Sequence, residues 1–214
     1  MNETRHLELN DITLAYTDTG VPPQPAAETL VFIHGAGANL NQFQPQVEHF
    51  ARKYRIIGPS LRGHGESTIP SDQGLEAFKL DIMAHDVIEL ISHLDAAPVH
   101  IVGNSAGGVM GLEIARQRPD LVRSLAIYGT PGKMSFPKLL QKFTLWFDSR
   151  NATKNPEKTY KTLSRYTSKM PHTREQVYQI FLEAKQAIPG FLYIPWVVRL
   201  SAGNPHASMP LLHI

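Results

Sequence analysis

A serine flanked by glycines gives the sequence its clearest chemical signal. Gly103-Asn104-Ser105-Ala106-Gly107, followed by Gly108, lies between a segment typical of a strand and one typical of a helix. A serine at the tip of such a turn has strained backbone geometry, and glycine two residues to either side avoids collisions with the neighbouring elements. N–H groups at the start of the helix would face a reacting oxygen that gains negative charge. We therefore predict that Ser105 is a catalytic nucleophile.

A second glycine-containing segment, His34-Gly35-Ala36-Gly37, follows an earlier apolar run. Attack on an acyl carbonyl needs two N–H donors for the oxyanion, one from the residue after the nucleophile and one from an upstream loop. The sequence predicts the backbone N–H groups of Ala36 and Ala106 for these two roles. His34 is interpreted as a structural residue that holds the loop, rather than as a group that transfers protons.

The elements that must position these groups follow the pattern of an α/β protein. Residues 1–132 alternate short β-rich runs with helical patterns, which is typical of a doubly wound, mostly parallel sheet with helices on both faces. The first two strands should form a β-hairpin. The predicted strands are His6–Leu9, Ile12–Thr17, Thr29–Ile33, Tyr54–Ile57, Val99–Val102 and Ser124–Tyr128, and the predicted helices are Gln42–Ala51, Leu75–Leu94 and Val109–Arg116.

From Lys133 onward the pattern changes to helices punctuated by proline and glycine. We expect residues 133–208 to form a helical cap on a core of residues 1–132, and residues 209–214 to begin the next core strand. The apolar side chains of the cap suggest a pocket for an acyl or aryl group, although packing among the cap helices explains most of them. The expected cap helices are Phe136–Phe147, Pro156–Tyr166, Arg174–Ile188 and Pro195–Leu200.

The composition excludes several classes of protein. With 42% hydrophobic and 19% charged residues and no cysteine, the chain reads as a globular protein without disulfides or thiolate metal sites. No secretory signal or membrane-spanning run is visible, so we expect a soluble cytoplasmic protein that needs no cofactor. The charge is −6 over residues 1–132 and +8 over residues 133–214. We interpret the basic part as a solvated helical face, rather than as a surface for nucleic acid, a membrane or an anionic partner.

Three motifs in order give a family resemblance. The loop at His34-Gly35, the turn from Arg62 to Ser67 and the motif from Gly103 to Gly107 together resemble the α/β-hydrolase superfamily. The resemblance implies the α/β-hydrolase fold, a serine hydrolase activity, and a catalytic acid and histidine that follow the serine along the chain. The asparagine before the serine is similar to that of carbon–carbon bond hydrolases, and also to that of esterases and lactonases. Ser60 stands where family members usually carry aspartate.

The acid and the histidine of the triad are expected beyond Ile214. His213 falls inside the predicted last strand, and Asp86 on a predicted helix is interpreted as structural. The other candidates are interpreted as surface, helix or cap residues, namely His64, His85, His93, His172 and His206. Loss of the triad partners removes about a millionfold of rate, so the chain alone should be nearly inactive. We expect a C-terminally truncated hydrolase whose final strands and helices are missing, or a chain completed by a second fragment or by a homo-oligomer.

The leading interpretation is a serine hydrolase that acts on an ester, lactone or similar carbonyl of a small molecule. The alternative is a non-catalytic pseudoenzyme, or a protein that uses the same fold to bind a small ligand. Reaction of Ser105 with a fluorophosphonate would separate the two interpretations. Nucleotide-dependent oxidoreduction is disfavoured, because no G-x-G-x-x-G pattern follows the first strand of the sheet.

Overall fold

A computed structural model describes residues 3–23, 26–70, 77–130, 133–134, 157, 161, 164–165, 170–183 and 196–197. A six-stranded sheet with the strand order β1-β2-β4-β3-β5-β6 forms its centre. β1 and β2 form an antiparallel hairpin, β2 is antiparallel to β4, and the remaining neighbours run parallel. The strands are β1 (Arg5–Glu8), β2 (Thr13–Asp18), β3 (Thr29–Ile33), β4 (Arg55–Pro59), β5 (Val99–Asn104) and β6 (Val122–Tyr128). The prediction of a mostly parallel α/β sheet is confirmed.

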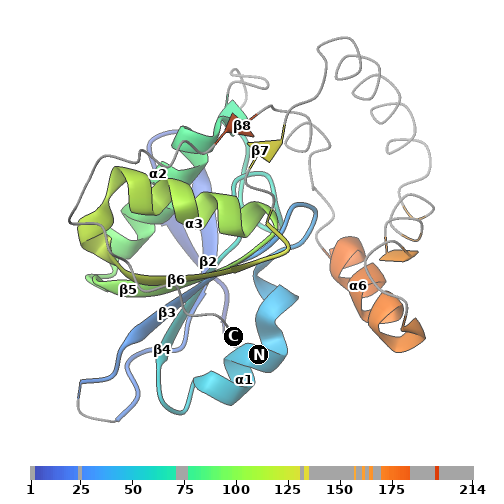
Figure 1. The fold of residues 1–214 in the computed structure, drawn as a ribbon, viewed down its shortest axis with the longest axis horizontal. Helices are drawn as coiled ribbons and strands as arrows, with labels where there is room; N and C mark the ends of the chain where they lie inside the picture. Colours follow the sequence, from blue (N-terminus) through green and yellow to red (C-terminus); the bar gives the residue numbers. More distant parts are fainter. Residues whose placement is uncertain are drawn as a thin grey trace.

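Helices cover both faces of this sheet (Figure 1). α2 (Leu80–His93) and α3 (Ala106–Gln117) pack side by side against one face, and α1 (Gln44–Phe50) lies against the other. Two short 3₁₀ turns, η1 (Leu40–Phe43) and η3 (Pro119–Leu121), lead into α1 and β6. Among the described helices, none combines the length and the apolar character that crossing a membrane requires.

Each face of the sheet has its own apolar core. The larger cluster joins α2 and α3 to the sheet through fully buried side chains such as Val87, Ile101 and Met110. The smaller cluster packs Phe43 on Phe32 of β3, with ring centroids 4.9 Å apart. Successive side chains of a strand point to opposite faces, so a parallel strand covered on both sides reads as a continuous apolar run. This explains why β3 and β5 could be predicted from sequence.

Two helices begin at residues other than those predicted. α2 begins at Leu80 rather than at Leu75, because Lys79 is extended (φ −61°, ψ 144°) and ends the helical pattern on that side. Residues 71–76 lie outside the described residues. α3 begins at Ala106 rather than at Val109. Its first turn consists of alanine and two glycines, whose small side chains give no apolar periodicity to detect.

The predicted helical cap falls only partly within the described residues. α6 (Pro171–Glu183) overlaps the predicted helix Arg174–Ile188. The prediction of a helix at Pro195–Leu200 is wrong for two residues, because Trp196–Val197 form β8 and pair antiparallel with β7 (Lys133–Met134). Aromatic and β-branched residues favour extended backbone, and the pairing partner decides the outcome.

The pairing of β7 with β8 brings together the start of the predicted cap segment and a part near its end. Met134 lies opposite Trp196, so the chain between them leaves and returns at neighbouring positions. An inserted cap requires this arrangement, and residues 133–208 remain our proposal for its limits. The predicted helix Phe136–Phe147, most of Pro156–Tyr166 and the predicted strand 209–214 lie outside the described residues.

Candidate active site

The segments singled out from the sequence follow the carboxyl ends of adjacent strands. β3, β4 and β5 lead into His34, Ser60 and Ser105, respectively. β3 and β5 end at the same level, because Ile33 is paired with Gly103. In open α/β sheets, ligands bind outside the carboxyl ends of the strands. The predicted nucleophile and the predicted oxyanion loop therefore share the edge of the sheet where a ligand is expected.

Ser105 occupies the sharp turn between β5 and α3. Its backbone has φ 51° and ψ −113°, a region that residues other than glycine rarely adopt. The Ser105 N–H donates to the carbonyl O of Tyr128 (2.9 Å), and the Ser105 carbonyl O accepts from the Gly108 N–H (3.1 Å) and the Thr130 hydroxyl (3.2 Å). Strain of this kind persists only where the surroundings fix it, and it clusters at functional sites.

Glycine is required on both sides of Ser105 because backbone segments approach closely there. A Cβ added at Gly107 would overlap the carbonyl O of Ile33 and lie 2.7 Å from the carbonyl O of His34. A Cβ added at Gly103 would lie 2.6 Å from the carbonyl C of Gly107. The first turn of α3 thus rests directly on the end of β3, and the glycine spacing of the motif has a packing cause.

Replacing Gly107 with alanine should lower the free energy of unfolding by about 3 kcal/mol or more, the upper end of the cost of overpacking. The reason is that the added Cβ meets backbone atoms of Ile33 and His34, which cannot rotate away. Urea unfolding at neutral pH measures the effect. Gly58→Ala is the matched control, because the nearest atom there is the Thr17 hydroxyl at 3.0 Å, which can move. Equal costs for the two variants would contradict the prediction.

The loop after β3 lies against the Ser105 turn. A Cβ added at Gly35 would be 2.9 Å from Asn104 Oδ1 and 3.5 Å from the Ser105 Cβ, so glycine permits this approach. In the described part of the chain, neither the Ala36 N–H nor the Ala106 N–H has a hydrogen-bond acceptor. Two such donors beside a serine can stabilise negative charge on a substrate oxygen.

Two buried histidines tie this loop to the turn after β4. The Nε2 atom of His34 accepts from the Leu61 N–H (2.9 Å), which leaves Nδ1–H to donate to the Gly35 carbonyl O (2.7 Å). In the reverse direction, Nε2 of His64 accepts from the Gly37 N–H (3.3 Å). His34 therefore holds the loop after β3 against the turn after β4, which agrees with its interpretation from sequence as a structural residue. The assignment of His64 to the surface, a helix or the cap is wrong, because it is 1% exposed within the turn.

Acid should destabilise the protein through these two histidines. Burial lowers the pKa of His34 from 6.5 to about 3, with a further contribution from His64, and burial lowers the pKa of His64 as well. Above pH 6.5 both rings are neutral in the folded and unfolded chains. Below pH 6.5, the unfolded chain binds protons that the folded protein does not, so the free energy of unfolding decreases as the pH is lowered. The effect of His34 alone should lower the free energy of unfolding by about 2 kcal/mol between neutral pH and pH 5.

Urea unfolding at pH 7.5, 6.0 and 5.0 measures this loss. His34→Gln, whose amide oxygen can still accept from the Leu61 N–H, should reduce the pH dependence. His85→Gln is the control, because the His85 side chain is 63% exposed on α2 and contacts only the carboxylate of Glu89, at 3.8 Å, in the described residues. A free energy of unfolding that stays constant from pH 7.5 to pH 5.0 would show that the buried rings do become protonated.

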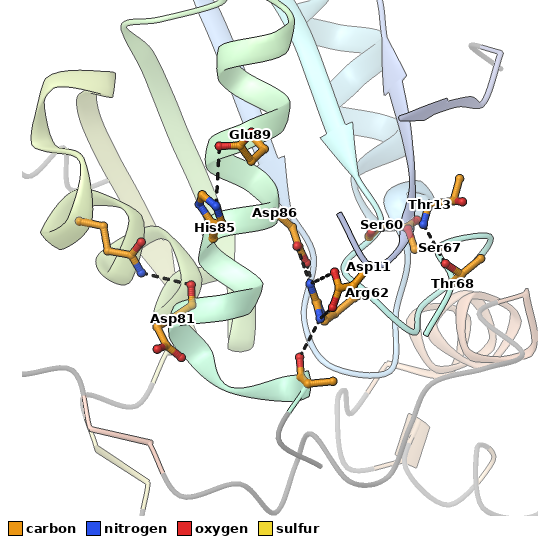
Figure 2. A network of polar contacts seen from close by, with 12 residues as sticks. Asp11, Thr13, Ser60, Arg62, Ser67, Thr68, Asp81, His85, Asp86 and Glu89 are labelled. Atoms are coloured by element: carbon orange, nitrogen blue, oxygen red, sulfur yellow. Dashed lines mark hydrogen bonds and ion pairs between the residues drawn. The ribbon is translucent and has the colours of Figure 1, made fainter. Parts of the chain in front are cut away.

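Arg62 is the centre of a buried ion cluster in the turn after β4 (Figure 2). Its guanidinium donates two hydrogen bonds of 2.7 Å to Asp86 on α2, two of 3.1 and 3.2 Å to Asp11, and one of 3.0 Å to the Ala77 carbonyl O. Burial disfavours the charged guanidinium, but Asp86 and Asp11 outweigh that effect and raise the pKa of Arg62. Asp86 therefore has the structural role expected of it.

Ser60, at the position where family members usually carry aspartate, is well hydrogen-bonded. Its hydroxyl accepts from the Leu40 N–H (3.2 Å), and its N–H donates to the Ala15 carbonyl O (2.8 Å). The Ser67 hydroxyl donates to the Ser60 carbonyl O (2.6 Å) and accepts from the Ala15 N–H (2.8 Å). The serine thus fixes the turn that carries Arg62 and His64 without the aspartate.

The histidines of the described residues lie apart from the hydrogen bonds that Ser105 makes. Within them, no histidine forms a hydrogen bond with Ser105, and no three metal-ligating side chains gather. His206 and His213 lie outside the described residues. The histidines interpreted as helix or cap residues lie on α2 and α6, namely His85, His93 and His172.

Two residues that the sequence did not single out contact the site. Thr130 donates its hydroxyl to the Ser105 carbonyl O, and Gln42 hydrogen-bonds to both Gly35 and Asn104. Gln42 and Asn104 are 62 positions apart, so no local pattern could reveal their contact. The available signal was position along the chain, because Gln42 lies in the segment after the predicted strand Thr29–Ile33 and Asn104 lies in the segment after Val99–Val102.

Comparison with known proteins agrees with this geometry. A family model described as the alpha/beta hydrolase fold matches residues 28–211, which is most of the chain. The chain belongs to the α/β-hydrolase fold family. Membership of this family accounts for the strand order, for the turn at Ser105 and for the position of both predicted motifs at one edge of the sheet.

This α/β-hydrolase family member is 35% identical over 105 residues to (E)-2-((N-methylformamido)methylene)succinate hydrolase of Acinetobacter baylyi, over 49% of the chain and 38% of that protein. It is 31% identical over 128 residues to 3-oxoadipate enol-lactonase 2 of the same organism, over 60% of the chain and 45% of that protein. The chain thus spans less than half the length of both curated relatives. A solved N-acyl homoserine lactonase shares the fold, with a TM-score of 0.68 and 23% identity over 89% of this chain and 68% of that one.

Proposed function

We propose that this protein is a serine hydrolase that cleaves an ester, a lactone or a similar carbonyl compound through Ser105. The observation that carries the proposal is the strained turn at Ser105 together with the N–H groups of Ala36 and Ala106, which have no acceptor in the described residues. A purely structural turn has no need of this combination. Removal of one oxyanion donor typically costs 10²- to 10³-fold in kcat, so selection for catalysis would preserve such a pair.

The proposed reaction proceeds in two acyl-transfer steps. The hydroxyl oxygen of Ser105 attacks the substrate carbonyl carbon, its proton passes to a histidine base, and the carbonyl oxygen becomes an oxyanion held by the N–H groups of Ala36 and Ala106. Collapse expels the alcohol, which takes the proton from the base, and leaves an acyl ester on Ser105. Water activated by the same base then releases the acid. We propose that this base lies outside the described residues.

The names of the relatives support a carbonyl substrate. One relative is named as a hydrolase of a methylenesuccinate that carries an N-methylformamido group, and the other as an enol-lactonase; an amide and a lactone each contain an acyl carbonyl. We propose that residues 133–208 form a cap over the carboxyl edge of the sheet and shape the pocket for the acyl or aryl part of the substrate. A soluble cytoplasmic location is part of the same proposal.

Labelling with a fluorophosphonate probe tests the proposal. The protein as expressed in its own host is treated with the probe, digested with trypsin and mapped by mass spectrometry. The adduct is expected on the peptide of residues 80–116, which contains Ser105. Mapping matters because Ser124 hydrogen-bonds His100 Nδ1 (2.7 Å) at the opposite edge of the sheet. Absence of an adduct on peptide 80–116 would show that the hydrolase proposal is wrong.

A non-catalytic binding protein is the second candidate. It is favoured by one observation, that no histidine in the described residues forms a hydrogen bond with Ser105. This candidate predicts that the protein binds small carbonyl compounds, detected by a rise in melting temperature, while Ser105 stays unlabelled. The hydrolase proposal predicts labelling together with ester turnover.

A further inference from the structure

A line of side-chain amides connects the oxyanion loop to the Ser105 turn. The Gly35 N–H donates to Gln42 Oε1 (2.8 Å), and Gln42 Nε2 donates to Asn104 Oδ1 (2.8 Å). Asn104 Nδ2 then points to the Tyr128 carbonyl O (3.5 Å), which also accepts from the Ser105 N–H (2.9 Å). Three segments that are distant in sequence, 35–42, 104–105 and the end of β6 at Tyr128, thus meet in one chain of hydrogen bonds.

The two ends of this chain determine the orientation of both amides. A backbone N–H can only donate, so Gln42 must present its oxygen to Gly35 and its NH₂ to Asn104. A backbone carbonyl can only accept, so Asn104 must present its NH₂ to Tyr128 and its oxygen to Gln42. No other pair of orientations satisfies every group, and hydrogen bonds that run in one direction strengthen one another.

We propose that Gln42 is a positioning residue for catalysis, which holds the loop carrying the Ala36 N–H at a fixed distance from the turn carrying Ser105 and the Ala106 N–H. The role rests on the proposed hydrolase function. Gly35 immediately precedes Ala36, so the hydrogen bond from Gly35 to Gln42 sets the position of that oxyanion donor. Asn104 immediately precedes Ser105, so the other end of the Gln42 amide is fixed to the nucleophile turn.

A small change in the distance between the oxyanion loop and the Ser105 turn should lower the reaction rate strongly. Displacement of a reacting group by about 1 Å can cost about 10²-fold in rate, and loss of one oxyanion donor costs a similar factor. Gln42→Met keeps the length of the side chain and removes both hydrogen bonds. We expect the maximal rate of fluorophosphonate labelling, or kcat for an ester, to fall about 10²-fold while the half-saturating concentration changes little.

Two measurements and a control test the role of Gln42 in the protein as expressed in its host. Amide hydrogen exchange at Gly35 should quicken at least about tenfold in Gln42→Met, because its acceptor is gone. Gln44→Met is the matched control, since the Gln44 side chain hydrogen-bonds only the exposed Glu48 in the described residues, and it should change neither the labelling rate nor the exchange. A double variant of Gln42→Met with Asn104→Ala should be no slower than the slower single variant, because the two act through one contact.

The outcomes separate this proposal from the function on which it rests. Wild-type protein without an adduct on Ser105 would refute the hydrolase, and unchanged exchange at Gly35 in Gln42→Met would refute the positioning role by itself. Labelling of Gln42→Met at the wild-type rate would likewise overturn the positioning role. So would a rate that falls only in proportion to the folded fraction measured by urea unfolding, because that result would assign Gln42 to stability alone.

Discussion

In the protein as expressed in its own host, with the proposed histidine base present, replacing Ser105 with alanine should abolish fluorophosphonate labelling and lower kcat for ester hydrolysis by about a millionfold, the loss measured when a serine nucleophile is removed. The structure gives the reason in the geometry of the turn. The φ of 51° and ψ of −113° are imposed by hydrogen bonds of backbone groups, which alanine retains. The fold should therefore survive, and the free energy of unfolding should change by less than about 1 kcal/mol.

Ser124→Ala is the matched control for this prediction. Ser124 hydrogen-bonds His100, but it is 6% exposed and lies near the amino end of β6, away from the Ala36 and Ala106 donors. Its replacement should leave labelling and kcat unchanged. Loss of labelling in Ser124→Ala with retention in Ser105→Ala would move the nucleophile to the opposite edge of the sheet and refute the proposed site.

The elements of the fold that local patterns determine were predicted well. β3 occupies Thr29–Ile33 as predicted, and the β1–β2 hairpin and β5 differ from their predicted ranges only at the ends. β2, β3 and β5 are recognisable because burial on one or both faces selects their residues. β7 and β8 were missed, because a two-residue pairing between Lys133–Met134 and Trp196–Val197 has no periodicity and depends on a partner over 60 positions away.

The site was predictable where chemistry restricts the backbone. Gly103, Gly107 and the serine between them mark a turn that few other sequences could form, so this motif reveals its structure locally. The supports of the turn could not be read in the same way. Gln42 and His64 belong to common residue types, and their roles arise from contacts between loops that only the packed sheet brings together. Sequence therefore indicated the candidate reacting groups and the supporting role of His34, and it missed the contacts of Gln42 and His64.

The buried ion cluster of Arg62, Asp86 and Asp11 stabilises the turn after β4 that supports the loop of the site. Replacing Asp86 with alanine should lower the free energy of unfolding by about 3 to 5 kcal/mol, because it leaves the guanidinium of Arg62 buried without its nearest counter-ion. Burial raises the pKa of the Asp86 carboxyl, and Arg62 offsets this only in part. A loss of that size is a large share of the 5 to 15 kcal/mol that typically stabilises a folded domain. Urea unfolding at pH 7.5 measures it.

Asp81→Ala on the same helix is the matched control, because Asp81 is exposed in the first turn of α2 and its hydrogen bond from Gln117 goes to the backbone carbonyl O, which alanine retains (Figure 2). It should cost about 0.3 to 1 kcal/mol. Replacing both members of the pair, as Arg62→Met with Asp86→Leu, should recover part of the Asp86→Ala loss, since no unpaired buried cation remains and Asp11 is 23% exposed. A cost for Asp86→Ala no larger than that of Asp81→Ala would mean that Asp11 and the Ala77 carbonyl suffice to hold Arg62.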